Sequence, residues 1–215
     1  MIFVAIGDIR GNMSALQCVL DLVMHEGIQT IVNTGDSVVD HPGSHEVIQV
    51  LRRQSIPSVQ GERDRWLARF GRKHDSLRER LPEVDFKALE RAYELCSSLD
   101  LEYLASLPSR LSLAVDGVSI EVCHGTLTGP ANALGPRVDA AIFQRQRELT
   151  AASIIVCGHG EEAFVRQVDD TLFVHPGSVG MASDGRAHYA VVSTETEPWH
   201  ADLRSAEYES VQNSG

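Results

Sequence analysis

The apolar and polar positions of the first sixty residues alternate between the patterns of strands and helices. The apolar run 1–6 predicts a buried strand, and residues 14–27 carry apolar side chains at helical spacing before a final glycine. A second strand at 30–34, a second helix at 44–54 and a third strand at 56–60 follow. Strands that alternate with helices at this spacing predict right-handed βαβ units around a parallel sheet.

The pattern changes between about residues 65 and 110. Six basic residues lie within 65–80, and apolar or aromatic residues recur at helical spacing within 86–93. This segment predicts a helical insertion that caps the sheet. We expect its charges to face solvent, with direct contact to a substrate as the alternative.

Short apolar segments return after residue 110 and are separated by turn signals. They lie at 110–115, 118–124, 153–159, 164–168, 171–177 and 188–193. Their close spacing predicts hairpins in a mixed or second sheet, followed by a loosely ordered polar tail at about 198–215. The lack of a linker-like segment predicts that residues 1–215 form a single domain.

Composition narrows the kinds of partner. A chain of 215 residues can bury one sizeable core, and its net charge of −11 argues against duplex nucleic acid as a partner. Small phosphorylated molecules can still bind where metals or local arginines supply positive charge. The four cysteines form no CxxC motif, so we expect free thiols in the cytoplasm. The sequence shows neither a signal-peptide pattern nor an apolar run of membrane-spanning length, so no membrane partner is expected.

Polar residues that can bind metals follow several of the predicted strands, each beside a glycine. They are Asp8, Asp36, Glu62 with Asp64, His124, and His159 with Glu161. Strand ends converge along one edge of a sheet, and glycines allow the tight turns that aim such side chains. Carboxylates with two imidazoles suit Mn²⁺, Fe²⁺ or Zn²⁺. One such turn alone would be an ordinary turn or a buried structural histidine, but five in the same arrangement favour a site.

The ordered motifs GDIRGN, NTGDSVVDHPG, VQGERD, VCHG, VCGHGE and HPGSVG resemble those of the calcineurin-like metallophosphoesterases. The similarity is greatest to the small bacterial phosphodiesterase and diadenosine-tetraphosphatase-type branch, over residues 1–64 and 118–192. It implies a four-layer αββα sandwich of two mixed β-sheets with flanking helices, with residues 65–117 as a variable cap. The implied activity is metal-dependent hydrolysis of a phosphodiester or nucleotide-type substrate.

The resemblance also implies a set of metal ligands. These are Asp8, Asp36, Glu62, His124, His159 and Glu161. Arg10 and Glu161 stand where the family has histidine, and Glu62 and His175 stand where it has asparagine. The departures fall at site positions while the neighbouring glycines are kept, which suggests a rearranged site rather than random decay.

These substitutions predict two unequal metal positions. One would combine Asp8, Asp36 and Glu161, but the fixed positive charge of Arg10 repels a cation, so we expect no ion there. The other combines two carboxylates and two imidazoles, from Asp36, Glu62, His124 and His159. This second set suits one divalent ion, which could be Mn²⁺, Fe²⁺, Zn²⁺ or Ni²⁺.

The remaining site residues are assigned by role. The predicted catalytic residues are Arg10, Arg63 and Asp64, and the predicted substrate-binding residues are Arg10, Arg63 and Asp40. Arg63 stands where the family has a histidine, and an arginine can stabilise phosphoryl charge but cannot donate a proton. Two hypotheses follow: an active phosphoesterase with one metal ion or an unusual pair, or a catalytically impaired relative. In the second, Arg10 and Arg63 replace metal charge and the protein binds a phosphorylated ligand or a protein partner.

Overall fold

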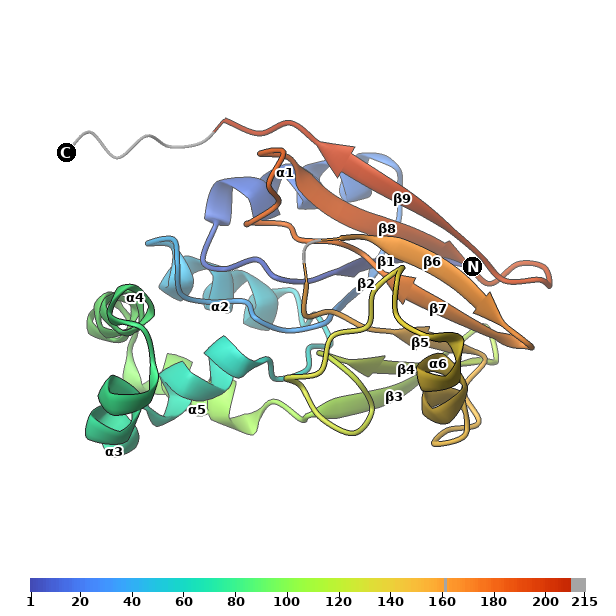
Figure 1. Ribbon diagram of the computed structural model, residues 1–215. Helices are drawn as coiled ribbons and strands as arrows, with labels where there is room; N and C mark the ends of the chain where they lie inside the picture. Colours follow the sequence, from blue (N-terminus) through green and yellow to red (C-terminus); the bar gives the residue numbers. More distant parts are fainter. Residues whose placement is uncertain (161, 210–215) are drawn as a thin grey trace.

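The computed structural model describes residues 1–160 and 162–209 and shows two mixed β-sheets packed face to face (Figure 1). The first sheet has the order β2-β1-β8-β9, formed by β1 (Ile2–Ile6), β2 (Thr30–Asn33), β8 (Ala187–Ser193) and β9 (His200–Ala206). The second has the order β3-β4-β5-β7-β6, formed by β3 (Arg110–Val115), β4 (Val118–Cys123), β5 (Ile154–Val156), β6 (Phe164–Val168) and β7 (Thr171–His175). Both sheets contain parallel and antiparallel pairs.

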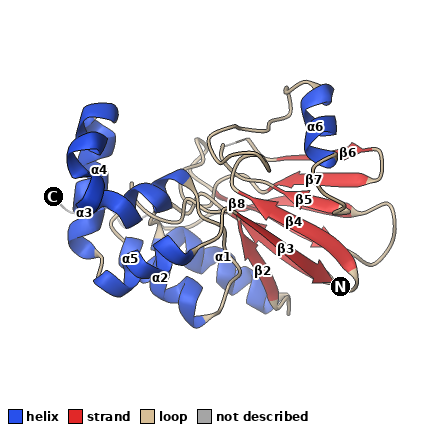
Figure 2. Ribbon diagram, turned by 90° about the horizontal axis from the view of Figure 1, so that it is seen from below, coloured by secondary structure: helices blue, strands red, loops and turns tan. Residues whose placement is uncertain are grey.

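Helices cover the outer faces of the two sheets and form a group at one side of them (Figure 2). Their bounds are α1 (Met13–His25), α2 (Ser44–Arg53), α3 (Glu62–Arg80), α4 (Glu83–Leu95), α5 (Ser98–Ser106) and α6 (Ala140–Arg147). Helices α1 and α2 pack on the first sheet and α6 packs on the second. The predicted four-layer αββα architecture is confirmed.

Strand β1 shows how the layers are held together. Its alternate residues Val4 and Ile6 pack with α1, whereas Phe3 and Ala5 pack between the two sheets. All four side chains are fully buried. A strand covered on both faces needs a continuous apolar run, which explains why residues 1–6 are all apolar.

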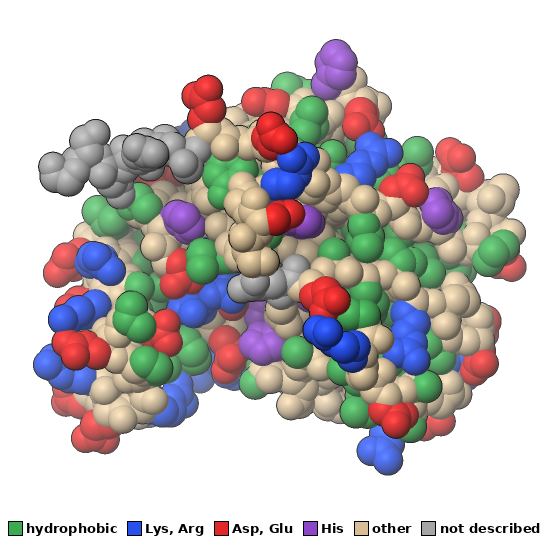
Figure 3. All heavy atoms as spheres, turned by 45° about the horizontal axis from the view of Figure 1, so that its top comes forward, with side chains coloured by type: hydrophobic (Ala, Val, Ile, Leu, Met, Phe, Trp, Pro, Cys, Tyr) green, Lys and Arg blue, Asp and Glu red, His purple; other side chains and the backbone are tan. Residues whose placement is uncertain are grey.

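Helices α3, α4 and α5 form the cap and have an apolar cluster of their own. Phe70 of α3 contacts Phe86 and Tyr93 of α4, with ring centroids 5.5 and 5.0 Å apart. Lys73 has non-helical dihedral angles, so α3 is kinked there. Basic and acidic side chains are interspersed on the outside of the cap (Figure 3), which matches a solvated surface.

Three local predictions differ from the structure. Residues 56–60 do not form a strand but make one isolated bridge, between Asn33 and Ser58, since Pro57 cannot donate to a ladder. The loosely ordered tail predicted from about 198 is wrong for His200–Ala206, which pair with β8 along seven residues. Helix α6 was not among the predicted elements. None of the helices in the described ranges is both long enough and apolar enough to cross a membrane.

Candidate functional site

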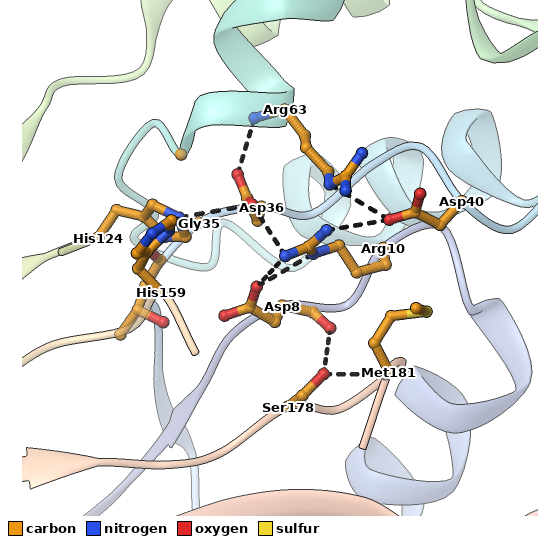
Figure 4. A network of polar contacts seen from close by, with 12 residues as sticks. Asp8, Arg10, Gly35, Asp36, Asp40, Arg63, His124, His159, Ser178 and Met181 are labelled. Carbon is orange, nitrogen blue, oxygen red and sulfur yellow. Dashed lines mark hydrogen bonds and ion pairs between the residues drawn. The ribbon is translucent and has the colours of Figure 1, made fainter. Parts of the chain in front are cut away.

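Four chain segments bring their side chains together where strands of both sheets end (Figure 4). Asp8 and Arg10 follow β1, and Asp36 follows β2. His124 directly follows β4, and His159 comes shortly after β5. The convergence predicted from the sequence is therefore present for these residues.

The backbone at these positions is strained. Asp8, Arg10, Asp36 and His159 have φ angles of 48°, 56°, 51° and 61°, in the left-handed region that non-glycine residues rarely adopt. A Cβ atom at Gly61 would collide with the carboxylate and the backbone nitrogen of Asp36, so only glycine fits beside it. Strain of about 1–3 kcal/mol per residue is kept where the surrounding structure enforces it, as at functional sites.

We call Asp36, His124 and His159 the histidine half of the site. The Nδ1–H group of His124 donates a hydrogen bond to the Thr34 carbonyl at 2.8 Å, which leaves His124 Nε2 facing the site. That nitrogen lies 3.5 Å from Asp36 Oδ2 and 3.3 Å from His159 Nδ1. One ligand atom from each of the three residues lies within 4.8 Å of the others, an arrangement that fits a divalent cation.

Electrostatics supports this assignment. Burial alone would lower the pKa of His124, but Asp36 outweighs it and raises the pKa to about 9. Burial would likewise raise the pKa of Asp36, yet His124 and Arg10 lower it. Burial and the neighbouring His124 lower the pKa of His159. A proton on His124 therefore supplies the positive charge that a bound metal ion would supply in its place.

We call Asp8, Arg10 and Asp40 the arginine half. Arg10 Nε and Nη2 donate to Asp8 Oδ1 at 3.0 and 2.8 Å, and its Nη1 donates to Asp40 Oδ2 at 3.0 Å. Arg10 Nη2 also lies 3.3 Å from Asp36 Oδ2, the carboxylate shared with the histidine half. One guanidinium thus contacts three carboxylates and partly offsets their negative charge.

The charges of this half depend on one another. Burial would lower the pKa of Arg10, but Asp36 and Asp8 outweigh it and raise the pKa further. Burial and the charge of Asp36 raise the pKa of Asp8. The second oxygen of Asp8, Oδ2, is buried without a hydrogen-bond partner among the described residues. Such an oxygen fits a nearby cation or proton donor.

Arg63 lies in the first turn of α3 and contacts the site twice. Its backbone N–H donates to Asp36 Oδ1 at 2.8 Å, and its Nε lies 3.3 Å from Asp40 Oδ2. Its Nη2 lies 3.6 Å from Asp85 at the start of α4. Asp40 therefore holds two guanidinium groups, which makes it a positioning residue, and its contact with a substrate stays a prediction.

Asp64 is fully buried, and its carboxylate accepts hydrogen bonds from three backbone groups. It accepts from the N–H groups of Asp36, Ser37 and Gly61, each at 2.9 Å. Burial and the charge of Asp36 raise its pKa to about 6. The predicted catalytic role is corrected on this ground, because a carboxylate enclosed by these donors supports the Asp36 loop and cannot touch a substrate.

Glu62 and Glu161 are two further predicted metal ligands. Glu62 does not join the group of converging ligand atoms; its carboxylate lies 3.7 Å from Arg65 on the same helix. The prediction for Glu161 falls outside the described residues. His175 is fully buried below the site, its Nδ1 accepts from the Gly177 N–H at 3.0 Å, and burial lowers its pKa to about 4.

The sequence did not reveal three supporting contacts. The Thr34 carbonyl orients His124, Asp85 contacts Arg63 from the cap, and Ser178 Oγ donates to the Asp8 carbonyl at 3.0 Å. The PGSVG motif was a signal for Ser178, since it lies in one of the ordered motifs. A backbone carbonyl and a cap residue leave no comparable signal.

A sandwich of two mixed sheets with acidic and histidine side chains at the strand ends defines the class of metallophosphoesterase-like proteins. The family model described as the calcineurin-like phosphoesterase superfamily domain matches residues 1–197. The chain belongs to this superfamily.

Solved structures agree on the fold. A hypothetical protein from Pyrococcus horikoshii is 21% identical with a TM-score of 0.84, covering 97% of this chain and 88% of that one. A metallophosphoesterase from Sphaerobacter thermophilus is 22% identical with a TM-score of 0.74, covering 97% and 89%. Vacuolar Protein Sorting 29 from Cryptosporidium parvum is 16% identical with a TM-score of 0.55, covering 96% and 97%.

Proposed function

We propose that the protein hydrolyses phosphoesters at a site that binds one divalent metal ion beside a fixed arginine. The family and the fold support phosphoester hydrolysis as the general class of reaction. The convergence of Asp36, His124 and His159 within 4.8 Å carries the proposal of an ion. Arg10, paired with the carboxylates of the other half, supports a count of one ion rather than two.

The residues present have separate tasks in this proposal. Asp36 Oδ2, His124 Nε2 and His159 Nδ1 would hold the ion, which can polarise a phosphoryl oxygen and activate water. The guanidinium of Arg10 lies beside them with 16% of its side chain exposed and can pair with phosphoryl oxygens. Arg63, with 18% exposed, can do the same from α3. Asp40 and Asp64 hold these groups in place.

The proposed substrate is a small phosphorylated molecule, either a phosphodiester or a nucleotide-type compound. The proposed ion is Mn²⁺, Fe²⁺, Zn²⁺ or Ni²⁺, since the ligand set of imidazole and carboxylate accepts each of them. The net charge of −11 supports a small substrate rather than duplex nucleic acid. A cytoplasmic location and the absence of a membrane partner stay expectations from the sequence.

Metal analysis and an assay test the proposal together. Protein purified without chelator is analysed for bound metal and then assayed with an aryl phosphodiester and with nucleotides, after addition of each of the four ions. We expect one ion per chain and metal-dependent turnover. Protein that takes up none of these ions and shows no turnover with any substrate would contradict the proposal.

A second candidate function is supported by the same arginine pairs. Arg10 pairs with Asp8, Asp36 and Asp40 and so supplies positive charge to the arginine half without a metal ion. The likeness in fold to Vacuolar Protein Sorting 29 is compatible with a role other than hydrolysis. In this alternative the protein binds a phosphorylated ligand or a protein partner, with Arg10 and Arg63 supplying the positive charge.

Calorimetry with inorganic phosphate separates the two candidates. The alternative predicts that phosphate binds to metal-free protein and that Arg10→Gln and Arg63→Gln each weaken it, while no condition gives turnover. The hydrolase predicts metal-dependent turnover whatever the affinity for phosphate.

A further inference from the structure

The side of the site next to the cap presents arginine rather than an acid that can release a proton. Arg63 is tied to the centre by its backbone N–H, 2.8 Å from Asp36 Oδ1, and its guanidinium lies beside Asp40. The group stays protonated at any pH at which a protein is folded. It can therefore donate hydrogen bonds to a phosphoester but cannot protonate a departing oxygen.

Four other ionisable groups around the centre contact other partners or are buried away from the cap. His124 and His159 point their ring nitrogens at each other and at Asp36. Asp64 is enclosed by backbone donors, and His175 is fully buried with its pKa lowered to about 4. Within the part of the chain that the structure describes, these four offer no proton to a leaving group on the cap side.

His41 directly follows Asp40 and is a further ionisable group near the site. Its Nε2 lies 3.1 Å from the Gly180 carbonyl. A carbonyl oxygen only accepts, so Nε2 carries the proton and donates it there. That bond holds the proton away from the centre, and His41 is the residue to test as a competing proton donor.

The guanidinium of Arg63 is less closely paired than that of Arg10. Arg10 and Arg63 share the single carboxylate of Asp40, at 3.0 and 3.3 Å. The second carboxylate near Arg63, from Asp85, lies farther away at 3.6 Å. Arg63 is therefore the guanidinium that can turn toward a departing anion and stabilise it.

We infer that Arg63 makes the site selective for phosphoesters and phosphoanhydrides whose leaving group departs as a stable anion, such as a phenolate or a phosphate. Esters of simple alcohols are poor substrates, because an alkoxide needs a proton as it leaves. This inference rests on the proposed hydrolase function and names its substrate class.

The proposed hydrolysis needs no acid to protonate the leaving group. Water oxygen forms a bond to phosphorus, and the bond from phosphorus to the leaving oxygen breaks. The leaving oxygen keeps the electron pair and departs as an anion facing Arg63. The proton lost by the attacking water goes to solvent.

The test measures kcat/KM of the metal-loaded protein for methyl aryl phosphodiesters of increasing phenol pKa, together with a dialkyl phosphate and a dinucleoside polyphosphate. We expect kcat/KM to fall steeply as the phenol pKa rises. The dialkyl ester should react slowest, and the polyphosphate should be hydrolysed. A slope near zero, or equal rates for aryl and alkyl esters, would overturn the inference.

Variants at position 63 assign the effect to this residue. Arg63→His supplies a proton donor and should raise kcat/KM for the dialkyl ester by about 100-fold, which is the ordinary contribution of a general acid. In this variant kcat/KM for the aryl esters should also depend less on the phenol pKa. Arg63→Gln should lower kcat/KM for the aryl esters by about 100-fold, because the anion loses its charged partner. Arg69→His, at an exposed position farther along α3, introduces a histidine on the same helix and should change neither.

The assays distinguish a failure of the proposed hydrolase function from a failure of the inference about Arg63. If no ester or anhydride reacts with any ion, the hydrolase function fails. If the protein hydrolyses esters but the slope is shallow and His41→Asn makes it steep, His41 is the proton donor and the inference about Arg63 is wrong. An unchanged slope in Arg63→His protein that binds metal as the parent does would also contradict it.

Discussion

The two halves of the site share the Asp36 carboxylate but obtain their positive charge differently. In the arginine half, the guanidinium of Arg10 is covalently part of the chain and pairs with Asp8 and Asp40 at about hydrogen-bond distance. In the histidine half, the nitrogens of His124 and His159 face each other at 3.3 Å and require a shared proton or an ion. One half carries its cation permanently, and the other is built to bind and release one.

The two halves differ in the source of their positive charge but not in the backbone that carries them. The strained loops that carry Asp8, Asp36 and His159 have the same left-handed backbone in both halves. Only the side chain at position 10 decides that the charge of its half is fixed.

The largest effect is expected in the histidine half. Replacing both His124 and His159 with alanine removes two of the three converging ligands, and metal content should fall from one ion per chain to none. Phosphodiester hydrolysis should fall to background. Elemental analysis and the assay check this outcome, with His200→Ala, at an exposed position on β9, as the control. Activity that survives with metal still bound would show that the ion lies elsewhere.

The corresponding change in the arginine half is expected to affect stability first. Arg10→Met keeps the volume but leaves buried Asp8 and Asp36 without their partner, which costs about 3 kcal/mol of unfolding free energy in metal-free protein. Added Mn²⁺ should recover more stability in this variant than in the parent, because the freed carboxylates can bind it. Denaturant unfolding with and without Mn²⁺ measures both effects.

A surface pair serves as the control for Arg10. Arg137→Met breaks the contact with Glu162, in which the arginine side chain is 89% exposed, and should change the unfolding free energy by less than about 0.5 kcal/mol. If Arg10→Met is equally mild and Mn²⁺ brings no extra stability, Arg10 does not act as a substitute cation.

Much of the difference between the two halves can be predicted from the sequence, because it depends on local patterns. The apolar run of β1 and the glycines beside Asp8 and Asp36 predict buried strands with tight turns at their ends. Arg10 at a position that would otherwise suit a ligand predicts a fixed cation. The four-layer sandwich was implied by the family resemblance, and the structure confirms it.

The failures have physical causes as well. Whether Asp64 faces the site or the backbone depends on three N–H groups from separate turns, which no local pattern encodes. Strand β9 is polar because one of its edges is unpaired in the described sheet order, so it resembles a tail. Glu62 points along its own helix toward Arg65, a choice between rotamers that spacing cannot predict.

A smaller effect is expected at the support shared by both halves. Asp64→Asn keeps the shape but replaces an acceptor oxygen by an NH₂ group that faces backbone donors, which should cost about 2 kcal/mol of unfolding free energy. Metal affinity should weaken modestly because Asp36 loses its anchored turn. Asp75→Asn, at a side chain 96% exposed, is the control and should be neutral. A neutral Asp64→Asn would show that the turn is held without the charge.

A pH dependence is expected in one half only. His124 has a pKa of about 9 in the metal-free fold, so below that pH an ion must displace its proton. Metal affinity should therefore fall about tenfold for each pH unit below 9 and level off above it. Titration calorimetry in buffers of different ionisation enthalpy measures the released proton, and affinity that is constant from pH 6 to pH 9 contradicts this assignment.

His124 also decides the direction in which the stability of the metal-free protein changes with pH. Because the folded pKa of His124 is raised above its ordinary 6.5, its contribution to the stability of metal-free protein is complete below pH 6.5 and is lost as the pH rises through about 9. Arg10 remains charged throughout that range, so the arginine half adds no such slope. His124→Asn should remove the slope, while Arg10→Met should leave it in place although it lowers stability at every pH. A slope that vanishes in Arg10→Met instead would show that the two halves titrate as one.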